Sequence, residues 1–336
     1  MVEVSFIVIA YNIEEYIEHC LESIINQKLE NININVEIVF VDDGSTDKTL
    51  ERVKKISKYE PRLKIITQQN KGANEARKTG FRNAEGQYII FVDGDDWISE
   101  DFTEIMYKKI KYSDFDIVCC NYYLVSKNGK LIKNKIKKCE YICENKYLEL
   151  VLKQKVSNNL WGKILKKDFI QKTEFMNFLG ISRGEDLVDN ILFAIEKPKV
   201  LICEEILYYY YQRETSTMNG DSSKLLEISK SLEYIENVLK KYDIYEKYKR
   251  EIDFLWFSNC YINSVVSTRI RVDKNHRLIY DIWKNKKINI KNNDLCKDYI
   301  KFMSLNRRII KILMDFNYYL GAFVLKVEYK IRNYNN

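Results

Sequence analysis

The first 120 residues alternate between short apolar runs and segments in which apolar side chains recur at helical spacing. Such runs are typical of strands buried on both faces. They are VSFIVIA (4–10), VEIVFV (36–41), LKIIT (63–67) and QYIIFV (87–92). Between the first two runs, Ile17, Leu21 and Ile24 are spaced by four and three, as on one face of a helix. The pattern predicts an α/β fold with a doubly wound, mostly parallel sheet that forms a Rossmann-like nucleotide-binding half.

Polar residues cluster at the end of each predicted strand. Folds of this class bind ligands outside the carboxyl ends of their strands. The clusters are Ala10, Tyr11 and Asn12; Asp42 and Asp43; Asn70 and Lys71; and Asp93, Asp95 and Asp96. A single polar cluster is explained by a helix cap. Four such clusters at the same edge of the predicted sheet instead predict a binding site.

The second half of the chain contains another acidic pair at a predicted helix start. Gly184 precedes Glu185 and Asp186, and Leu187, Ile191 and Ile195 then follow at helical spacing. Two acids in a first turn are also explained by the helix dipole, so structural and catalytic interpretations both stay open. Asn128-Gly129 predicts a hairpin within 121–138. Beyond about residue 220, helical spacing predicts a helical C-terminal region.

Composition narrows the chemistry. The chain is 46% hydrophobic and 31% charged, with a net charge of +7, which suits a folded protein and does not by itself indicate nucleic-acid binding. Eight scattered cysteines and a start unlike a signal peptide predict reduced thiols in the cytoplasm. With two histidines in all, catalysis is expected to rest on carboxylates.

Residues 301–336 are basic, with seven Lys or Arg against two acids. Basic residues mixed with Ile, Leu, Phe and Tyr are typical of an interfacial helix on anionic lipid. A terminal helix that packs on the protein body has the same composition, and both interpretations stay open. No run of about 18 apolar residues occurs, so no bilayer-spanning segment is predicted.

The predicted site has no glycine-rich phosphate loop, because GxGxxG and GxxxxGKS are both absent. Carboxylates at the strand ends reach a phosphate only through a hard cation such as Mg2+ or Mn2+. A nucleoside diphosphate with a metal ion is therefore the expected ligand.

The motifs VSFIVIAYNIEEYIEHCLESIINQ, VEIVFVDDGSTDKT and NKGANEARKTGFRNAEGQYIIFVDGDDW together resemble family 2 inverting, metal-dependent glycosyltransferases of the GT-A fold. LWGKILKKDFI, GED and ILYYYYQRETSTM are similar to the bacterial capsular polysaccharide and teichoic-acid type within this family. Ala10 stands where many relatives have proline.

The resemblance implies a UDP-sugar donor and assigns roles to residues. Asp93-Gly94-Asp95 would be the DxD element, with Asp95 on the metal and Asp93 towards the ribose and metal, and Asp42 would meet the uracil. Further donor contacts are assigned to Ala10, Tyr11, Asn12, Glu14, Asn70, Lys71, Arg77 and Gly94. Asp186 would be the general base with Glu185 beside it. Acceptor or pyrophosphate contacts are assigned to Asp96, Trp161, Tyr211 and Arg213.

The expected enzyme is thus a hexosyl- or N-acetylhexosaminyltransferase that acts on a hydroxyl of a cell-surface glycan, lipid-linked oligosaccharide or teichoic-acid-like acceptor. Its expected domains are 1–220, divided into donor (1–120) and acceptor (121–220) halves, and a helical region, 221–336. It is expected in the cytoplasm, with peripheral contact of 301–336 at the inner membrane face, and homo-oligomerisation stays open. The alternative is an inactive glycosyltransferase-like module that binds glycans. A receiver domain would leave the GED and DxD segments unexplained. A nucleotidyltransferase is expected to have a glycine-rich signature after its first strand, and this chain lacks one.

Overall fold

The structure, a computed structural model, describes residues 1–126, 128–133, 138–143, 146–175, 182–213, 222–267 and 271–334. It consists of two compact units. The first contains residues 1–148, 158–182 and 189–213, and the second contains 149–157, 183–188 and 214–336. The chain therefore passes between the units several times.

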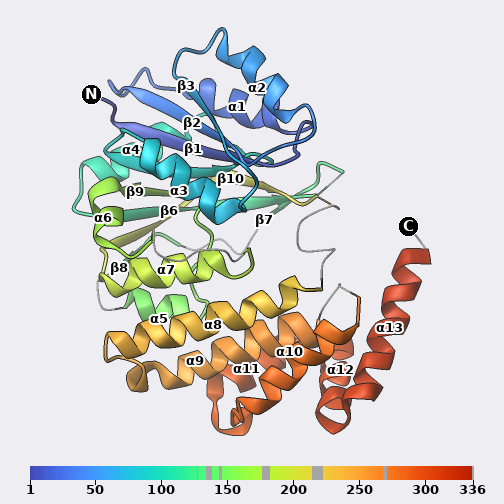
Figure 1. The fold of residues 1–336 in the computed structure, drawn as a ribbon. Coiled ribbons are helices and arrows are strands. Elements are labelled where there is room, and N and C mark those ends of the chain that lie inside the picture. The colour runs from blue at the N-terminus through green and yellow to red at the C-terminus, as the bar shows by residue number, and fades with distance from the viewer. Residues whose placement is uncertain are drawn as a thin grey trace. The chain divides into compact units, whose positions relative to one another are not determined.

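A mixed sheet forms the centre of the first unit (Figure 1). Within the described residues its strand order is β3-β2-β1-β4-β9-β6-β10-β5, with β7 on β6 and β8 on β10. The strands are β1 (Val4–Ala10), β2 (Val36–Asp42), β3 (Leu63–Thr67), β4 (Tyr88–Asp93), β5 (Trp97–Ile98), β6 (Ile117–Val125), β7 (Leu131–Lys133), β8 (Glu140–Ile142), β9 (Lys163–Lys166) and β10 (Val200–Tyr211).

The four strands predicted from apolar runs are confirmed. β1 and β3 match the predicted ranges residue by residue, β2 extends by one residue to Asp42, and β4 both begins and ends one residue later than predicted, at Tyr88 and Asp93. These four strands are parallel to one another. The rest of the sheet is mixed, because β9 runs antiparallel to both β4 and β6.

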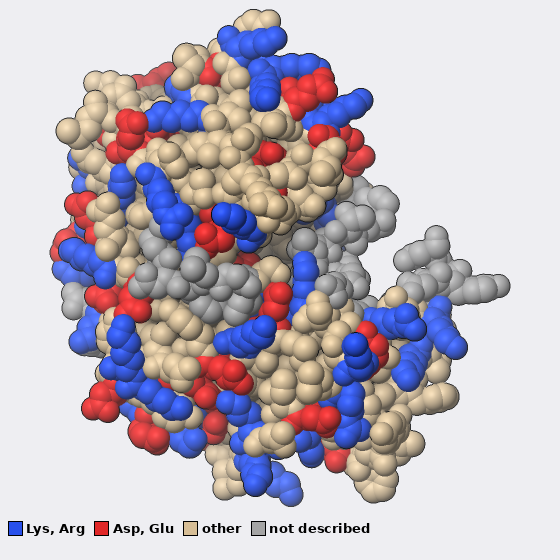
Figure 2. Space-filling view, in the orientation of Figure 1, with Lys and Arg blue, Asp and Glu red and all other residues tan. Residues whose placement is uncertain are grey.

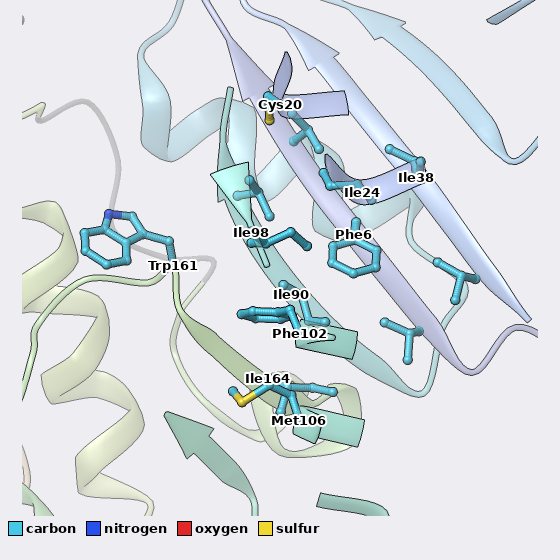
Figure 3. Close-up of a cluster of buried hydrophobic side chains, with 14 of the residues drawn as sticks. Phe6, Cys20, Ile24, Ile38, Ile90, Ile98, Phe102, Met106, Trp161 and Ile164 are labelled. Carbon is cyan, nitrogen blue, oxygen red and sulfur yellow. The ribbon is translucent and has the colours of Figure 1, made fainter. Parts of the chain in front are cut away.

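Helices cover both faces of this sheet. They are α1 (Ile17–Ile25), α2 (Thr49–Ser57), α3 (Ala73–Asn83), α4 (Phe102–Lys111), α5 (Tyr147–Leu152), α6 (Lys167–Lys172) and α7 (Glu185–Ile195), of which α5 and α7 each contribute residues to both units. Side chains from α1, α2 and α4 pack with Phe6 and Ile38 in one hydrophobic cluster (Figure 3). α3 lies on the opposite face, where a Cβ on Gly80 would come within 2.3 Å of Ile7 Cγ2. Phe175 contacts Phe81, Phe91 and Phe193 on that side.

The predicted hairpin is present. β6 and β7 pair antiparallel, and Ser126 N donates to Lys130 O across the turn. Gly129 has φ +70°, a left-handed conformation that glycine adopts without steric cost. Residues 127 and 134–137 of this segment lie outside the described residues.

The second unit contains the predicted C-terminal helices. They are α8 (Lys224–Lys241), α9 (Lys249–Leu255), α10 (Lys274–Asn285), α11 (Asp294–Phe302), α12 (Leu305–Phe316) and α13 (Tyr318–Tyr334), with a π-helical segment at Trp256–Val266. Tyr261 stacks on Trp283 with ring centroids 4.9 Å apart. His276 is buried between the Tyr318 hydroxyl (2.9 Å) and the Val265 carbonyl oxygen (3.1 Å). In the described part of the chain, no helix is both long and apolar enough to cross a bilayer.

Candidate active site

The predicted polar edge forms where β2, β1 and β4 end side by side. Ala10 pairs with Asp42 on one side, and its neighbour Ile9 pairs with Asp93 on the other. The parallel register therefore brings these two carboxylates to the same end of the sheet. Asp42 is almost fully buried, and Ser45 N donates to both its oxygens at 3.2 and 3.3 Å.

The loop after β1 is tied to the loop after β2. Asn12, at φ +50°, donates its backbone N–H to Ser45 Oγ, and its side-chain oxygen accepts from Thr46 N at 2.8 Å. Glu14 Oε2 accepts from Lys48 N at 2.7 Å. Asn12 and Glu14 thus hold the two loops together, and their donor contacts stay a prediction. Tyr11 is 43% exposed at the same loop.

Asp43 organises the loop after β3, a role that the sequence analysis did not assign. Its carboxylate accepts from Gln68 Nε2, Lys71 N and Gly72 N at 2.7 to 2.9 Å. Three donors explain why a carboxylate is buried here. The side chains of Asn70 and Lys71, both predicted donor contacts, are left exposed beside this loop.

Two of the three aspartates after β4 are paired with arginines. Arg77, buried on α3, donates from Nη2 to Asp93 Oδ1 at 2.9 Å. Arg213 Nε lies 2.6 Å from Asp95 Oδ2, and its guanidinium lies over the ring of Tyr16. The side chains of Asp93 and Asp95 are 25% and 17% exposed, so both reach solvent.

Gly94 between them is required by packing. Its N–H donates to Ile9 O at 3.0 Å, and a Cβ would come within 2.6 Å of Ile13 Cδ1 and 2.8 Å of the Ile9 oxygen. Only glycine lets the turn lie this close to β1.

Asp96, the third aspartate, is buried and fully hydrogen-bonded. Tyr208 Oη donates to Asp96 Oδ2 at 2.7 Å, and Tyr211 N donates to Oδ1 at 2.8 Å. The predicted contact of Asp96 with the acceptor or pyrophosphate stays a prediction, and in this structure the carboxylate ties β10 to the turn after β4. Burial, followed by the charges of Asp95 and Asp93, raises the pKa of Asp96 well above its ordinary value.

The same electrostatics indicate that the pair after β4 suits a cation. The pKa of Asp95 is raised by burial and by the charge of Asp93, while Arg213 opposes that rise. Repulsion between carboxylates is relieved when a divalent ion lies between them. Within the described residues no group of three or more His, Cys, Asp or Glu side chains is placed to hold a metal. Asp93 and Asp95 would hold a Mg2+ or Mn2+ ion only together with ligands from outside the protein, such as phosphate oxygens and water.

Trp161 belongs to the core. It is 7% exposed and stacks on Tyr208 and Tyr210 with centroids 4.4 and 5.3 Å apart. With the indole this deeply buried, little of it is left at the surface for an acceptor, and the acceptor contact stays a prediction. Tyr211 instead packs at the edge, 5.2 Å from Tyr16 between ring centroids.

The second acidic pair begins α7, as predicted. Gly184 precedes it at φ +87°, and Ser231 Oγ on α8 donates to Arg183 O at 2.9 Å. Glu185 and Asp186 are partly exposed and belong to the second unit, whereas the aspartates after β4 belong to the first.

A buried polar cluster anchors the next turn of α7 within the first unit, and the sequence analysis did not predict it. Asn190 Oδ1 accepts from Lys163 Nζ at 2.5 Å and from Tyr147 Oη at 3.2 Å. Asp189 Oδ2 accepts from Asn74 Nδ2 of α3 at 3.5 Å. The feature of the sequence that could have predicted this cluster is the polar pair Asp189-Asn190 on an otherwise apolar helix face.

Comparison with known proteins identifies the relatives of this chain. Residues 5–172 match the family described as Glycosyl transferase family 2. The chain is 36% identical over 224 residues to glycosyltransferase GlyA of Streptococcus pneumoniae, covering 64% of this chain but only 31% of that protein. It is 32% identical to the putative glycosyltransferase EpsH of Bacillus subtilis, over 77% of this chain and 76% of EpsH.

Solved structures show the same fold. The crystal structure of residues 1–349 of S. aureus TarS matches with a TM-score of 0.63 and 21% identity, over 83% of this chain and 77% of that chain. TarS 1–349 has also been solved in complex with UDP-GlcNAc, and that structure matches with a TM-score of 0.61 and 18% identity over 98% of this chain and 91% of that one. The central sheet with its flanking helices is thus of the GT-A type.

Proposed function

Because this chain belongs to glycosyltransferase family 2 and is a glycosyltransferase, we propose that it moves a sugar from a UDP-sugar to an acceptor hydroxyl with inversion at the anomeric carbon. We propose further that donor binding depends on Mn2+ or Mg2+.

One observation carries this proposal: Asp93 and Asp95 both reach solvent at the carboxyl end of β4, and burial together with the charge of Asp93 raises the pKa of Asp95. A site that concentrates negative charge in this way favours a bound cation. Arg77 holds Asp93 from the protein side, which leaves its second oxygen available for the ribose or the ion. TarS, which has the same fold, has been solved with UDP-GlcNAc.

The bound metal would neutralise charge on the diphosphate and on the UDP leaving group. Asp95 and Asp93 would hold it. Asp42 would accept from the uracil, and the exposed Tyr11, Asn70 and Lys71 would border the nucleotide. Arg213 pairs with Asp95 without the donor, and we propose that it turns to the pyrophosphate when the donor binds, because a guanidinium binds phosphate in two-point geometry.

Asp186 would act as the general base, with Glu185 as its neighbour. It would take the proton from the acceptor hydroxyl while that oxygen bonds to the anomeric carbon. The bond from this carbon to the UDP oxygen breaks on the opposite face, so the configuration inverts in one displacement. The turn at Gly184 gives this acid a defined position, because Ser231 of α8 holds the preceding carbonyl.

For the acceptor we propose a glycan or lipid-linked oligosaccharide of the cell surface, assembled at the cytoplasmic face of the membrane. The capsular and teichoic-acid type motifs support this class. Loop details decide which sugar and which linkage are used.

The direct test is slow donor hydrolysis. The purified chain is incubated with UDP-glucose, UDP-galactose, UDP-N-acetylglucosamine and UDP-N-acetylgalactosamine in turn, with Mn2+, with Mg2+ or with EDTA, and released UDP is measured. We expect release from one or two donors that stops in EDTA. Release that persists in EDTA contradicts metal dependence, and release from none of the donors with either metal overturns the proposal in favour of an inactive glycan-binding module.

A further inference from the structure

The C-terminal helices expose a row of large apolar side chains. On α12 the row has spacings of four, three and four, which places its members on one side of the helix. On α13 a second row continues after the turn at Asn317. We call these the apolar rows: Leu305, Ile309, Ile312 and Phe316 on α12, and Tyr319, Leu320, Phe323, Val327 and Ile331 on α13, which are 40% to 84% exposed.

These rows are not the surfaces through which the two helices pack. α12 buries Ile310 and Met314, and α13 buries Tyr318, Ala322 and Leu325. The helices approach closely at Gly321, where a Cβ would come within 2.5 Å of Met314 Cγ. Each helix therefore has one apolar side inside the unit and a second apolar side in solvent. Such a surface, roughly 1,000 Å² from side chains of this size, is larger than most monomers expose and marks an interaction site.

Basic residues border the apolar rows. Lys326 and Lys330 are exposed one turn apart on α13 next to Phe323 and Val327. In the described residues no acidic group lies within ion-pair distance of either lysine. Figure 2 shows blue side chains over the C-terminal helices, interspersed with tan ones and with some red ones.

A shallow groove of about 480 Å³ opens beside Tyr319 and Phe323. Three cations line it: Lys274, Arg277 and Lys326. Arg277 lies over the Tyr318 ring at 4.6 Å and pairs with Asp281 at 2.9 Å. The acid in the lining, Asp273, accepts from Asn275 N, His276 N and Ser222 Oγ, so its carboxylate is already engaged.

We propose that the apolar rows and the adjoining groove dock this protein on the surface of an anionic lipid bilayer. The apolar side chains enter the boundary between headgroups and acyl chains, and Lys326, Lys330 and the groove face lipid phosphates. This combination of an exposed apolar side and flanking lysines is what interfacial helices use. The docking surface is argued from the second unit alone and stands whether or not the proposed donor and metal are right.

Charge disfavours a second copy of this chain as the occupant. A two-fold interface brings the same surface of both copies together. The lysines of both copies would then be brought into one interface, and an excess of like charge there costs binding free energy.

The test is co-sedimentation of the full chain with vesicles of phosphatidylcholine alone or mixed with phosphatidylglycerol. We expect binding to the mixed vesicles that weakens as salt is raised, because salt screens the lysines. The double variant Phe316→Ser/Phe323→Ser should lower the partition coefficient about tenfold, and Lys326→Gln/Lys330→Gln should remove most of the preference for anionic vesicles.

Matched controls are Tyr59→Ser and Tyr112→Ser, which remove aromatic rings that are 88% and 80% exposed on the first unit. They should bind vesicles like the unmodified chain. Absence of binding to anionic vesicles, or binding that neither double variant weakens, overturns the proposal. A concentration-dependent dimer that Phe316→Ser/Phe323→Ser dissociates, in a protein that ignores vesicles, assigns the surface to a second copy instead.

Discussion

At the scale of single residues, the three aspartates after β4 have three different environments. Asp93 is held by Arg77, Asp95 faces Arg213 at the surface, and Asp96 is buried under Tyr208. The sequence shows three similar acids within four positions, and only the surrounding contacts separate the solvent-reaching Asp93 and Asp95 from the buried Asp96. We therefore expect substitution of Asp95 to affect UDP binding, and substitution of Asp186 to affect the transfer rate.

Asp95→Asn should weaken UDP binding in Mn2+ at least tenfold, or about 1.4 kcal/mol, because it removes one of two carboxylates that would hold the ion. In EDTA the variant should bind UDP at least as tightly as the unmodified protein, because Arg213 no longer has to leave the Asp95 carboxylate. Calorimetric titration measures both. Glu100→Gln, which removes an exposed acid paired with Lys28, is the control and should change neither value. An undiminished effect of Mn2+ in Asp95→Asn would contradict the metal assignment.

Asp186→Asn should lower the transfer rate by about 10²- to 10⁴-fold, the range ascribed to general-base catalysis, and leave UDP affinity unchanged. Initial rates with the identified donor and acceptor, beside UDP titration, separate the two effects. Glu196→Gln removes an exposed acid just after the end of the same helix and should retain full activity. Transfer by Asp186→Asn at the unmodified rate would exclude Asp186 as the base.

His276 predicts how stability depends on pH. Burial lowers the pKa of His276 from its ordinary value near 6.5, so the unfolded chain takes up a proton at a higher pH than the folded one. The free energy of unfolding should therefore fall as pH drops below about 6.5, by about 1.4 kcal/mol for each unit by which the two pKa values differ. His276→Gln should flatten this part of the pH profile in urea unfolding. His19→Gln is the control, and a profile unaffected by His276→Gln would be inconsistent with a buried neutral imidazole.

At the scale of elements, the sequence predicts those strands and turns whose formation depends on residues close together in the chain. Buried apolar runs located four strands to within a residue or so, and the Asn128-Gly129 turn located the hairpin. The insertion of β9 between β4 and β6 was not predictable, because it pairs segments far apart in sequence. The same holds for Asp96 with Tyr208, which are 112 residues apart, and for Lys163 with Asn190.

The turn before α7 is an element whose geometry depends on one glycine. Gly184 has φ +87°, and a Cβ there would lie 2.9 Å from Ile228 Cδ1 and 3.0 Å from Ser231 Oγ. Gly184→Ala should lower the free energy of unfolding by about 2–3 kcal/mol, since backbone strain and crowding against α8 add.

Gly129→Ala is the matched comparison for this turn. Gly129 also has a left-handed φ, +70°, but nothing lies within 4 Å of its Cβ position. The variant Gly129→Ala should lower the free energy of unfolding by only about 1–2 kcal/mol in the same denaturant titration, because only the backbone is strained. Equal losses for both variants would mean that α8 does not confine the turn.

At the scale of the whole molecule, the chain does not divide at one point. A boundary at residue 220 was predicted from the fading family motifs, whereas residues 149–157 and 183–188 join the C-terminal helices in the second unit. Neither segment has a composition that distinguishes it from the first unit, because its membership depends on contacts made after folding. The acidic pair Glu185-Asp186 therefore lies in one unit while α7 continues into the other.

Cysteine accessibility tests this organisation across both units at once. All eight cysteines are free thiols: Cys139 and Cys143 are exposed, Cys119 and Cys120 are intermediate, and Cys20, Cys203, Cys260 and Cys296 are buried. Burial raises the pKa of Cys260 and Cys296 to about 12, which suppresses the reactive thiolate as well as access to it.

Iodoacetamide in native buffer should therefore label Cys139 and Cys143 first and spare the four buried thiols, whereas in denaturant all eight should react. Peptide mass spectrometry over time assigns each site. Because Cys20 and Cys203 report on the first unit and Cys260 and Cys296 on the second, early labelling of either pair would show that the corresponding core is not packed as described. A reducing agent should leave the melting temperature unchanged, since no disulfide joins any of the eight thiols.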